Sequence, residues 1–213
     1  MRKHNGICKV CGRRRVVVYL RASGEYLCAR CLSRRIERKV SRRLKSVAGK
    51  SIVIGFETTG TIALMHILAK VFKEGKWKIY SPENSMLLEW AIARYKFEKV
   101  HLPLIGQKTS LILPFTLEEF SSLLLKWLLK LDYRELVNNR IIAPLSSFSI
   151  EQLEVYASYR KLPIVPVNAE EDVYGEIFSI IEESTPTIRY QFLSSIKNVK
   201  NLVNKSSELH ESI

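Results

Sequence analysis

The chain has 213 residues, of which 46% are apolar, and a formal net charge of +13, which suits one medium domain with a small appendage. No segment is apolar for about 18 consecutive residues, so a membrane span is not expected. No apolar stretch follows Met1, so a signal peptide is not expected either. The expected location is the cytoplasm. The charge is segregated, because residues 1–50 hold 16 Lys and Arg against 2 acidic residues. This segregation favours a polyanionic partner. Nucleic acid is preferred over an anionic membrane surface, because no basic segment has a wide apolar face.

All four cysteines lie in the first 31 residues, as two C-x2-C pairs separated by 16 residues: Cys8, Cys11, Cys28 and Cys31. Two such turns supply the four thiolates of a tetrahedral site, which zinc prefers. The spacer predicts a β-hairpin with strands near Val16–Leu20 and Tyr26–Leu27. Disulfides, a redox pair and an iron–sulfur site are the weaker alternatives. The expected cofactor is one structural Zn²⁺ ion, with no iron–sulfur cluster.

The most basic stretch of the chain is predicted to be a helix. An apolar stripe recurs there at every fourth residue: Leu32, Ile36, Val40 and Leu44. The cations expected to face solvent and contact nucleic acid are Arg34, Arg35, Arg38, Lys39, Arg42 and Arg43. A solvated helix face is the alternative. Like charges repel at i,i+4 spacing, however, and bound phosphates would relieve that repulsion.

From Ser51 onward, short apolar runs alternate with helical patterns. Strands are predicted at Ser51–Phe56, Trp77–Tyr80, Lys99–Leu104, Ile141–Ala143 and Ile164–Val167. Helices are predicted at Ile62–Phe72, Met86–Tyr95, Leu117–Leu131, Ser149–Lys161, Val173–Ile181 and Ile188–Val203. The alternation predicts an α/β fold, with a parallel sheet covered by helices on both faces. The expected division is a four-cysteine zinc module at 1–31, a basic linker helix at 32–50, the α/β domain at 51–172 and a helical segment at 173–213.

The order of zinc module, basic helix and strand–turn–helix resembles the cytoplasmic tRNA 2-thiolation proteins, a branch of the PP-loop (N-type ATP pyrophosphatase) superfamily. The resemblance is carried by the two cysteine pairs, Arg21–Leu27, Ile52–Phe56 and Ala63–Leu68. A weaker match covers Ala143–Leu145, Glu151–Tyr159 and Thr185–Tyr190. The resemblance implies a PP-loop-like (adenine nucleotide alpha hydrolase-like) domain, tRNA as the partner, and wobble-uridine (U34) 2-thiolation as the reaction served.

In active members of that family the turn after the first strand reads S-G-G-x-D-S, and its glycines let backbone N–H groups surround the pyrophosphate of ATP. The same positions here are Phe56, Glu57, Thr58, Thr59, Gly60 and Thr61. Both motif glycines are replaced and Glu57 repels phosphate, so ATP binding is not expected. Active members also resemble one another in carrying further cysteines, whereas zinc would take all four cysteines here.

The resemblance therefore implies a non-catalytic member, similar to the degenerate partner subunit of the eukaryotic thiolation complex. The expected partners are tRNA and either a catalytic PP-loop protein or a second copy. Two other hypotheses are a divergent ATP-dependent tRNA-modifying enzyme and a zinc-ribbon nucleic-acid-binding regulator. His66, inside the apolar run Leu64–Leu68, is expected to be a packing residue rather than a catalytic base.

Overall fold

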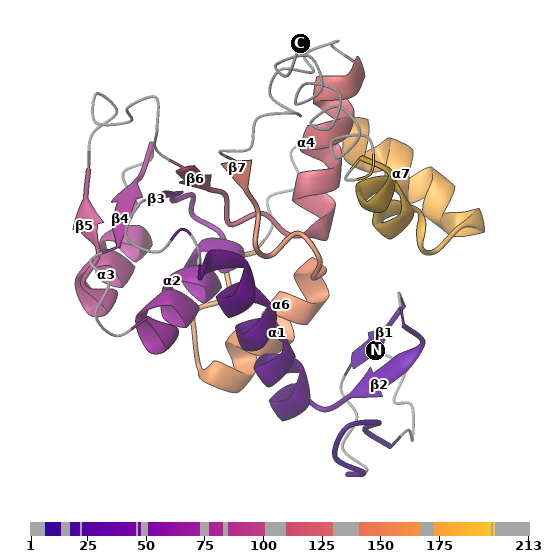
Figure 1. Cartoon of the computed structure of the whole chain (residues 1–213), viewed down its shortest axis with the longest axis horizontal. Helices are drawn as coiled ribbons and strands as arrows, with labels where there is room; N and C mark the ends of the chain where they lie inside the picture. Colours follow the sequence, from indigo (N-terminus) through magenta and orange to yellow (C-terminus); the bar gives the residue numbers. More distant parts are fainter. Residues whose placement is uncertain are drawn as a thin grey trace, which may run out of the picture.

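The computed structural model describes residues 7–13, 18–21, 23–45, 47, 51–72, 77–82, 85–100, 110–129, 141–166, 173–196 and 198. In these ranges a small antiparallel hairpin leads into a long helix, and a parallel sheet with its helices follows (Figure 1). None of the helices in these ranges has the length and apolar character needed to cross a membrane.

The amino-terminal hairpin joins β1 (Val18–Leu20) to β2 (Glu25–Leu27). Its turn passes through Gly24, whose φ of +64° is a left-handed conformation that suits glycine. The basic helix α1 (Ala29–Leu44) follows directly. The whole predicted apolar stripe is fully buried: Leu32, Ile36, Val40 and Leu44. The hairpin and the amphipathic helix are therefore both confirmed.

Five strands form the central sheet in the order β5-β4-β3-β6-β7, and every neighbouring pair is parallel. Their bounds are β3 (Ser51–Ile54), β4 (Lys78–Tyr80), β5 (Glu98–Lys99), β6 (Ser110–Ile112) and β7 (Ile141–Ile142). The predicted parallel α/β architecture is confirmed. The strand β6 was not predicted from the sequence.

The strand expected at Ile164–Val167 is not formed by its described residues. Residues 162–166 join no strand, and Val165 exchanges both of its backbone hydrogen bonds with the Thr59 hydroxyl, at 2.9 and 3.2 Å. The backbone of this segment is therefore bonded to the start of a helix instead of a neighbouring strand. Residues 101–104 of the third predicted strand lie outside the described residues. So do residue 197 and residues 199–203 of the last predicted helix.

Helices cover the sheet in two groups. α1 packs against α2 (Thr59–Val71) and α6 (Ile150–Arg160), and α3 (Met86–Tyr95) packs against α2, below the sheet in Figure 1. On the other side α4 (Leu117–Leu129) packs with α7 (Val173–Ser184). Four of these helices have side-chain N-caps, because the hydroxyls of Thr58, Ser85, Thr116 and Ser149 accept from backbone N–H groups in the first turn.

One apolar core runs from the hairpin to the sheet. It joins Cys8 and Leu27 to the buried stripe of α1, and continues through Leu64 of α2 to Tyr156 of α6. The core therefore fixes α1 against α2 and α6. The four-segment division stays a prediction.

Candidate metal centre and nucleic-acid interface

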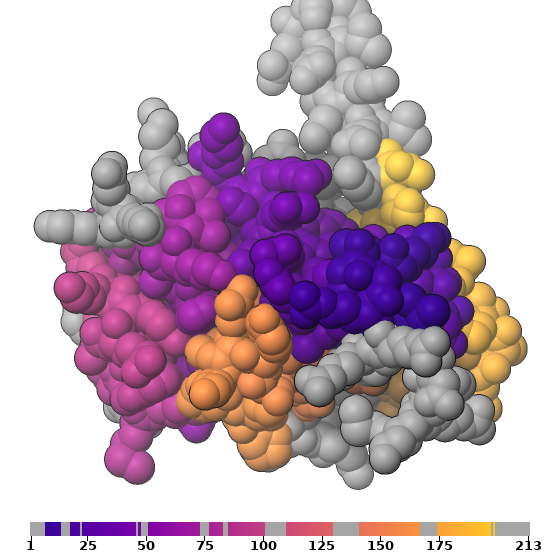
Figure 2. Space-filling view, turned by 90° about the horizontal axis from the view of Figure 1, so that it is seen from below, coloured from indigo at the N-terminus to yellow at the C-terminus, as the bar shows by residue number. Residues whose placement is uncertain are grey.

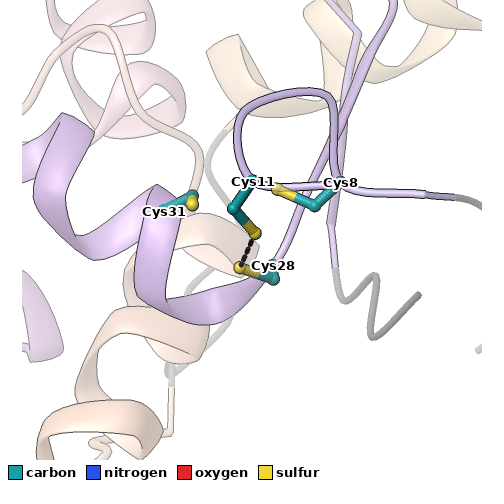
Figure 3. A group of neighbouring side chains, drawn as sticks. All are labelled: Cys8, Cys11, Cys28 and Cys31. Atoms are coloured by element: carbon teal, nitrogen blue, oxygen red, sulfur yellow. Dashed lines mark hydrogen bonds between the residues drawn. The ribbon is translucent and has the colours of Figure 1, made fainter. Parts of the chain in front are cut away.

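Four cysteine sulfurs converge beside the hairpin, all within 4.8 Å of one another (Figure 3). Cys8 and Cys11 lie on a tight loop closed by a 2.8 Å hydrogen bond from Gly12 N to Cys8 O. Cys28 is the N-cap of α1, and Cys31 lies in the first turn of that helix. The Cys11 and Cys28 sulfurs are 3.7 Å apart, so thiols from the loop and the helix meet directly.

The cysteines differ in how easily they lose a proton. Burial opposes ionisation of Cys8, but backbone N–H groups of Cys28, Cys11 and Val10 outweigh burial and lower the pKa of Cys8 to about 6. Burial and three neighbouring thiols raise the pKa of Cys31 to about 12. Four thiolates can coexist at this spacing only with a cation among them, as a metal centre provides.

The donor set fits two kinds of metal centre. A tetrahedral ion about 2.3 Å from each sulfur would place the sulfurs about 3.8 Å apart. Four cysteines are equally the ligand set of a [4Fe–4S] cluster, which holds its sulfurs further apart because each binds a different iron. When bound, either centre would cross-link the Cys8–Cys11 loop to the start of α1.

Four arginines of α1 form a row opposite its buried stripe. They recur at every fourth residue: Arg30, Arg34, Arg38 and Arg42. All four are exposed, and within the described part of the chain none forms an ion pair or a side-chain hydrogen bond. We call these residues the arginine row. Arg30 shares the i,i+4 register of the others, and this signal could have placed it among the predicted contacts.

The other three predicted cations contact the protein itself. Arg35 donates to Glu25 of the hairpin at 2.7 Å, and Lys39 lies over the Phe148 ring at 5.4 Å. Arg43 donates to the carbonyl oxygens of Ala143 and Pro144, at 3.0 and 3.1 Å, and burial lowers its pKa. These three side chains hold α1 in place, whereas the arginine row is available to a partner.

The turn between β3 and α2 is closed by hydroxyl groups. Thr58 accepts a hydrogen bond from Thr61 N at 3.2 Å, and the Thr61 hydroxyl accepts one from Phe56 N at 3.2 Å. A Cβ atom on Gly60 would lie 2.4 Å from the carbonyl oxygen of Pro114, so this position requires glycine. Two N–H groups that a phosphate cradle would use are therefore bonded inside the turn.

Comparisons with known proteins bear on the fold. No protein-family model matches the chain, and no curated protein matches it. Among solved structures, the chain is similar to the U34-tRNA thiolase NcsA from Methanococcus maripaludis with its [4Fe-4S] cluster. The TM-score is 0.71 at 12% sequence identity, over 92% of this chain and 87% of that one. The chain thus shares the fold of that thiolase.

Two sequence-based predictions are corrected by this likeness. The prediction that the chain is a non-catalytic pseudoenzyme is wrong, because the fold it shares is that of an active thiolase. The prediction of zinc alone, with no iron–sulfur cluster, is also wrong, because that thiolase carries a [4Fe-4S] cluster and four cysteines converge here. The two errors share a cause, and the replaced glycines of the turn also contributed to the first. Assigning every cysteine to zinc removed the thiols on which sulfur chemistry depends, although the same ligand set serves iron–sulfur clusters.

Proposed function

We propose that this chain binds tRNA through the arginine row and takes part in 2-thiolation of the wobble uridine. The observation that carries the proposal is the shared fold, which covers 92% of the chain. The fold also favours the hypothesis of a tRNA-modifying enzyme over that of a zinc-ribbon regulator.

The geometry of α1 supports contact with a phosphate backbone. Residues four apart on a helix are about 6 Å apart along its axis, so the arginine row presents regularly spaced guanidinium groups. Guanidinium groups bind phosphate by paired, charge-assisted hydrogen bonds. Because the opposite side of α1 is buried, the row cannot turn inward, and bound phosphates would offset the repulsion among its charges.

The proposed metal centre would orient this helix. Cys28 and Cys31 lie at the start of α1, next to Arg30, while the Glu25–Arg35 ion pair joins the same helix to β2. Loss of the metal would therefore loosen the end of α1 that leads into the arginine row.

Binding of total tRNA by a charge-reversal variant tests the proposal. Arg38→Glu with Arg42→Glu should weaken binding at least tenfold at near-physiological salt, and should lower the slope of log affinity against log salt by about 0.7 to 0.9 per lost phosphate contact. The control is Lys78→Glu with Lys126→Glu, which reverses the same charge at exposed sites on β4 and α4. Equal affinities of the two variants would contradict the proposal.

A second PP-loop chain is part of the proposal, as the resemblance implies. Copurification from native extract tests for that second protein. An ATP titration of the isolated protein shows which of the two binds ATP. Binding at micromolar concentration would assign ATP-dependent activation to the protein described here, and absence of binding would assign it to the second protein.

A further inference from the structure

A cavity of about 320 Å³ opens between α2, α3 and the end of α6. Among its lining residues are His66 of α2, Trp90 of α3 and Lys161 after α6. His66 lies five residues after Thr61, about 7.5 Å along α2 from the end of the Phe56–Thr61 turn. Figure 2 looks onto the side where α6 (orange) comes to the surface beside α3. None of the residues that line the cavity belongs to that turn or to the arginine row.

Aromatic groups form one wall of the cavity. Trp90 is 40% exposed, and its ring centroid lies 6.3 Å from that of Tyr95. The Tyr95 ring in turn lies edge-on to His66 at 5.8 Å. The Arg94 guanidinium lies 5.2 Å from the Trp90 ring centroid. Exposed indole rings and arginine planes are the surfaces on which unpaired nucleobases stack.

The charges around the cavity are positive. Arg94, Arg160 and Lys161 line it, and no carboxylate in the described ranges forms an ion pair with Arg94 or Lys161. Glu37 pairs with Arg160, but it also pairs with Lys70. Cations near helix C-termini offset the helix dipole, which accounts for the placement of Arg94 and Arg160. It does not account for the exposed Trp90.

Three buried polar atoms of residues that line this cavity have no hydrogen-bond partner among the described residues: His66 Nε2, Tyr95 Oη and Arg160 Nε. A buried polar atom without a partner costs free energy, so each is a place where a bound group can gain a hydrogen bond. Burial and the nearby Arg160 and Lys70 lower the pKa of His66, so the imidazole is neutral at pH 7 and can accept or donate one bond. Groups of this kind can form hydrogen bonds with the polar edge of a base.

We propose that this cavity binds one nucleotide, with its base against Trp90 and its phosphate toward Arg94 and Lys161. The volume lies within the range of small-molecule sites. The nucleotide is either a free 5′-mononucleotide or an unpaired residue of an RNA, because the recognition chemistry is the same. The inference does not depend on binding by the arginine row.

Titrations on the full, metal-loaded chain test the site with four probes: UMP, AMP, inorganic phosphate and an unstructured single-stranded RNA. At least one nucleotide probe should bind, and Trp90→Leu should weaken it about tenfold. Trp127→Leu, which changes a partly buried tryptophan of α4, should leave that affinity unchanged. Arg94→Gln should weaken binding, whereas Arg38→Glu with Arg42→Glu should not change mononucleotide binding, which separates this site from the arginine row.

The probes also identify the source of the nucleotide. Binding of UMP or AMP, lost in Trp90→Leu, indicates a free nucleotide, and binding of the RNA alone, with the same loss, indicates an unpaired RNA residue. Inorganic phosphate that binds as tightly as the nucleotides would overturn the proposal, because the base would add nothing. Failure of every probe to bind, or equal binding by Trp90→Leu, would also overturn it.

Discussion

Glu37 of α1 and Arg160 of α6, which are 123 residues apart, form an ion pair. Lys70 of α2 donates to the same carboxylate at 2.9 Å, and the Tyr156 hydroxyl donates to it at 3.3 Å. The single acidic residue of the basic helix thus joins three helices, and it also holds the Arg160 guanidinium beside the cavity.

Replacement of Glu37 should destabilise the fold. Glu37→Gln removes the charge that neutralises Arg160, so the free energy of unfolding should fall by about 1–3 kcal/mol in chemical denaturation. Lys70→Gln is the matched control. It should cost less than about 1 kcal/mol, because Lys70 is more exposed than Glu37. Equal losses of unfolding free energy in the two variants would contradict the claim that Glu37 stabilises the fold by neutralising Arg160.

The Glu37 carboxylate should also make the folding stability depend on pH in the acid range. Burial opposes ionisation of Glu37, but Lys70 and Arg160 lower its pKa below the ordinary 4.5. The stabilisation is then present above about pH 4.5 and is lost as the pH falls through the lowered pKa. Glu37→Gln should therefore show a smaller loss of melting temperature below pH 4.5 than the wild type. Parallel profiles would contradict this assignment.

Glu118 should have the opposite effect. It lies in the first turn of α4 and accepts a hydrogen bond from Ile150 N at 3.0 Å, and burial raises its pKa above 4.5. The folded state then binds the proton more tightly, so this group lowers stability as the pH rises above about 4.5. Glu118→Gln keeps an acceptor for Ile150, and its stability advantage should grow from pH 4.5 to 7. Glu151→Gln, an exposed change on α6, should not have this effect.

Arg43 and its neighbour Arg42 form a matched pair. Arg43→Ala removes the donor to the Pro144 carbonyl and one of the donors to the Ala143 carbonyl, which keeps its bonds from Ser146, and should cost about 1–3 kcal/mol of folding free energy. Arg42→Ala should cost less than about 0.5 kcal/mol, but should weaken tRNA binding. A reversed order of stabilities would contradict the division of α1 into structural cations and the arginine row.

Removal of one thiolate should abolish metal binding. Cys28→Ser should lose its metal and unfold the hairpin, because small metal modules draw their folding free energy from the metal. Elemental analysis for zinc and iron, together with acid-labile sulfide, measures the centre in the wild type and its loss in the variant. Wild-type protein that contains neither metal, or a variant that keeps its metal, would contradict the four-cysteine assignment.

Much of the fold and of the candidate site could be predicted from local sequence patterns. The cysteine spacing predicted that the four sulfurs converge, and the four-residue period predicted the buried side of α1. The period could not distinguish Arg42 from Arg43, because the partners of Arg43 lie 100 and 101 residues further along the chain. The cavity could not be predicted either, since Trp90, His66 and Lys161 meet only when three helices pack. The metal was misjudged because zinc and iron–sulfur centres share one ligand set.

The central claim is participation in wobble-uridine thiolation, and mass spectrometry of tRNA tests it most directly. In a strain that lacks this gene, 2-thiouridine at position 34 should disappear. The wild-type gene and the Lys78→Glu, Lys126→Glu control should restore it, whereas Arg38→Glu with Arg42→Glu should restore it poorly. Unchanged 2-thiouridine in the strain without the gene would contradict the account.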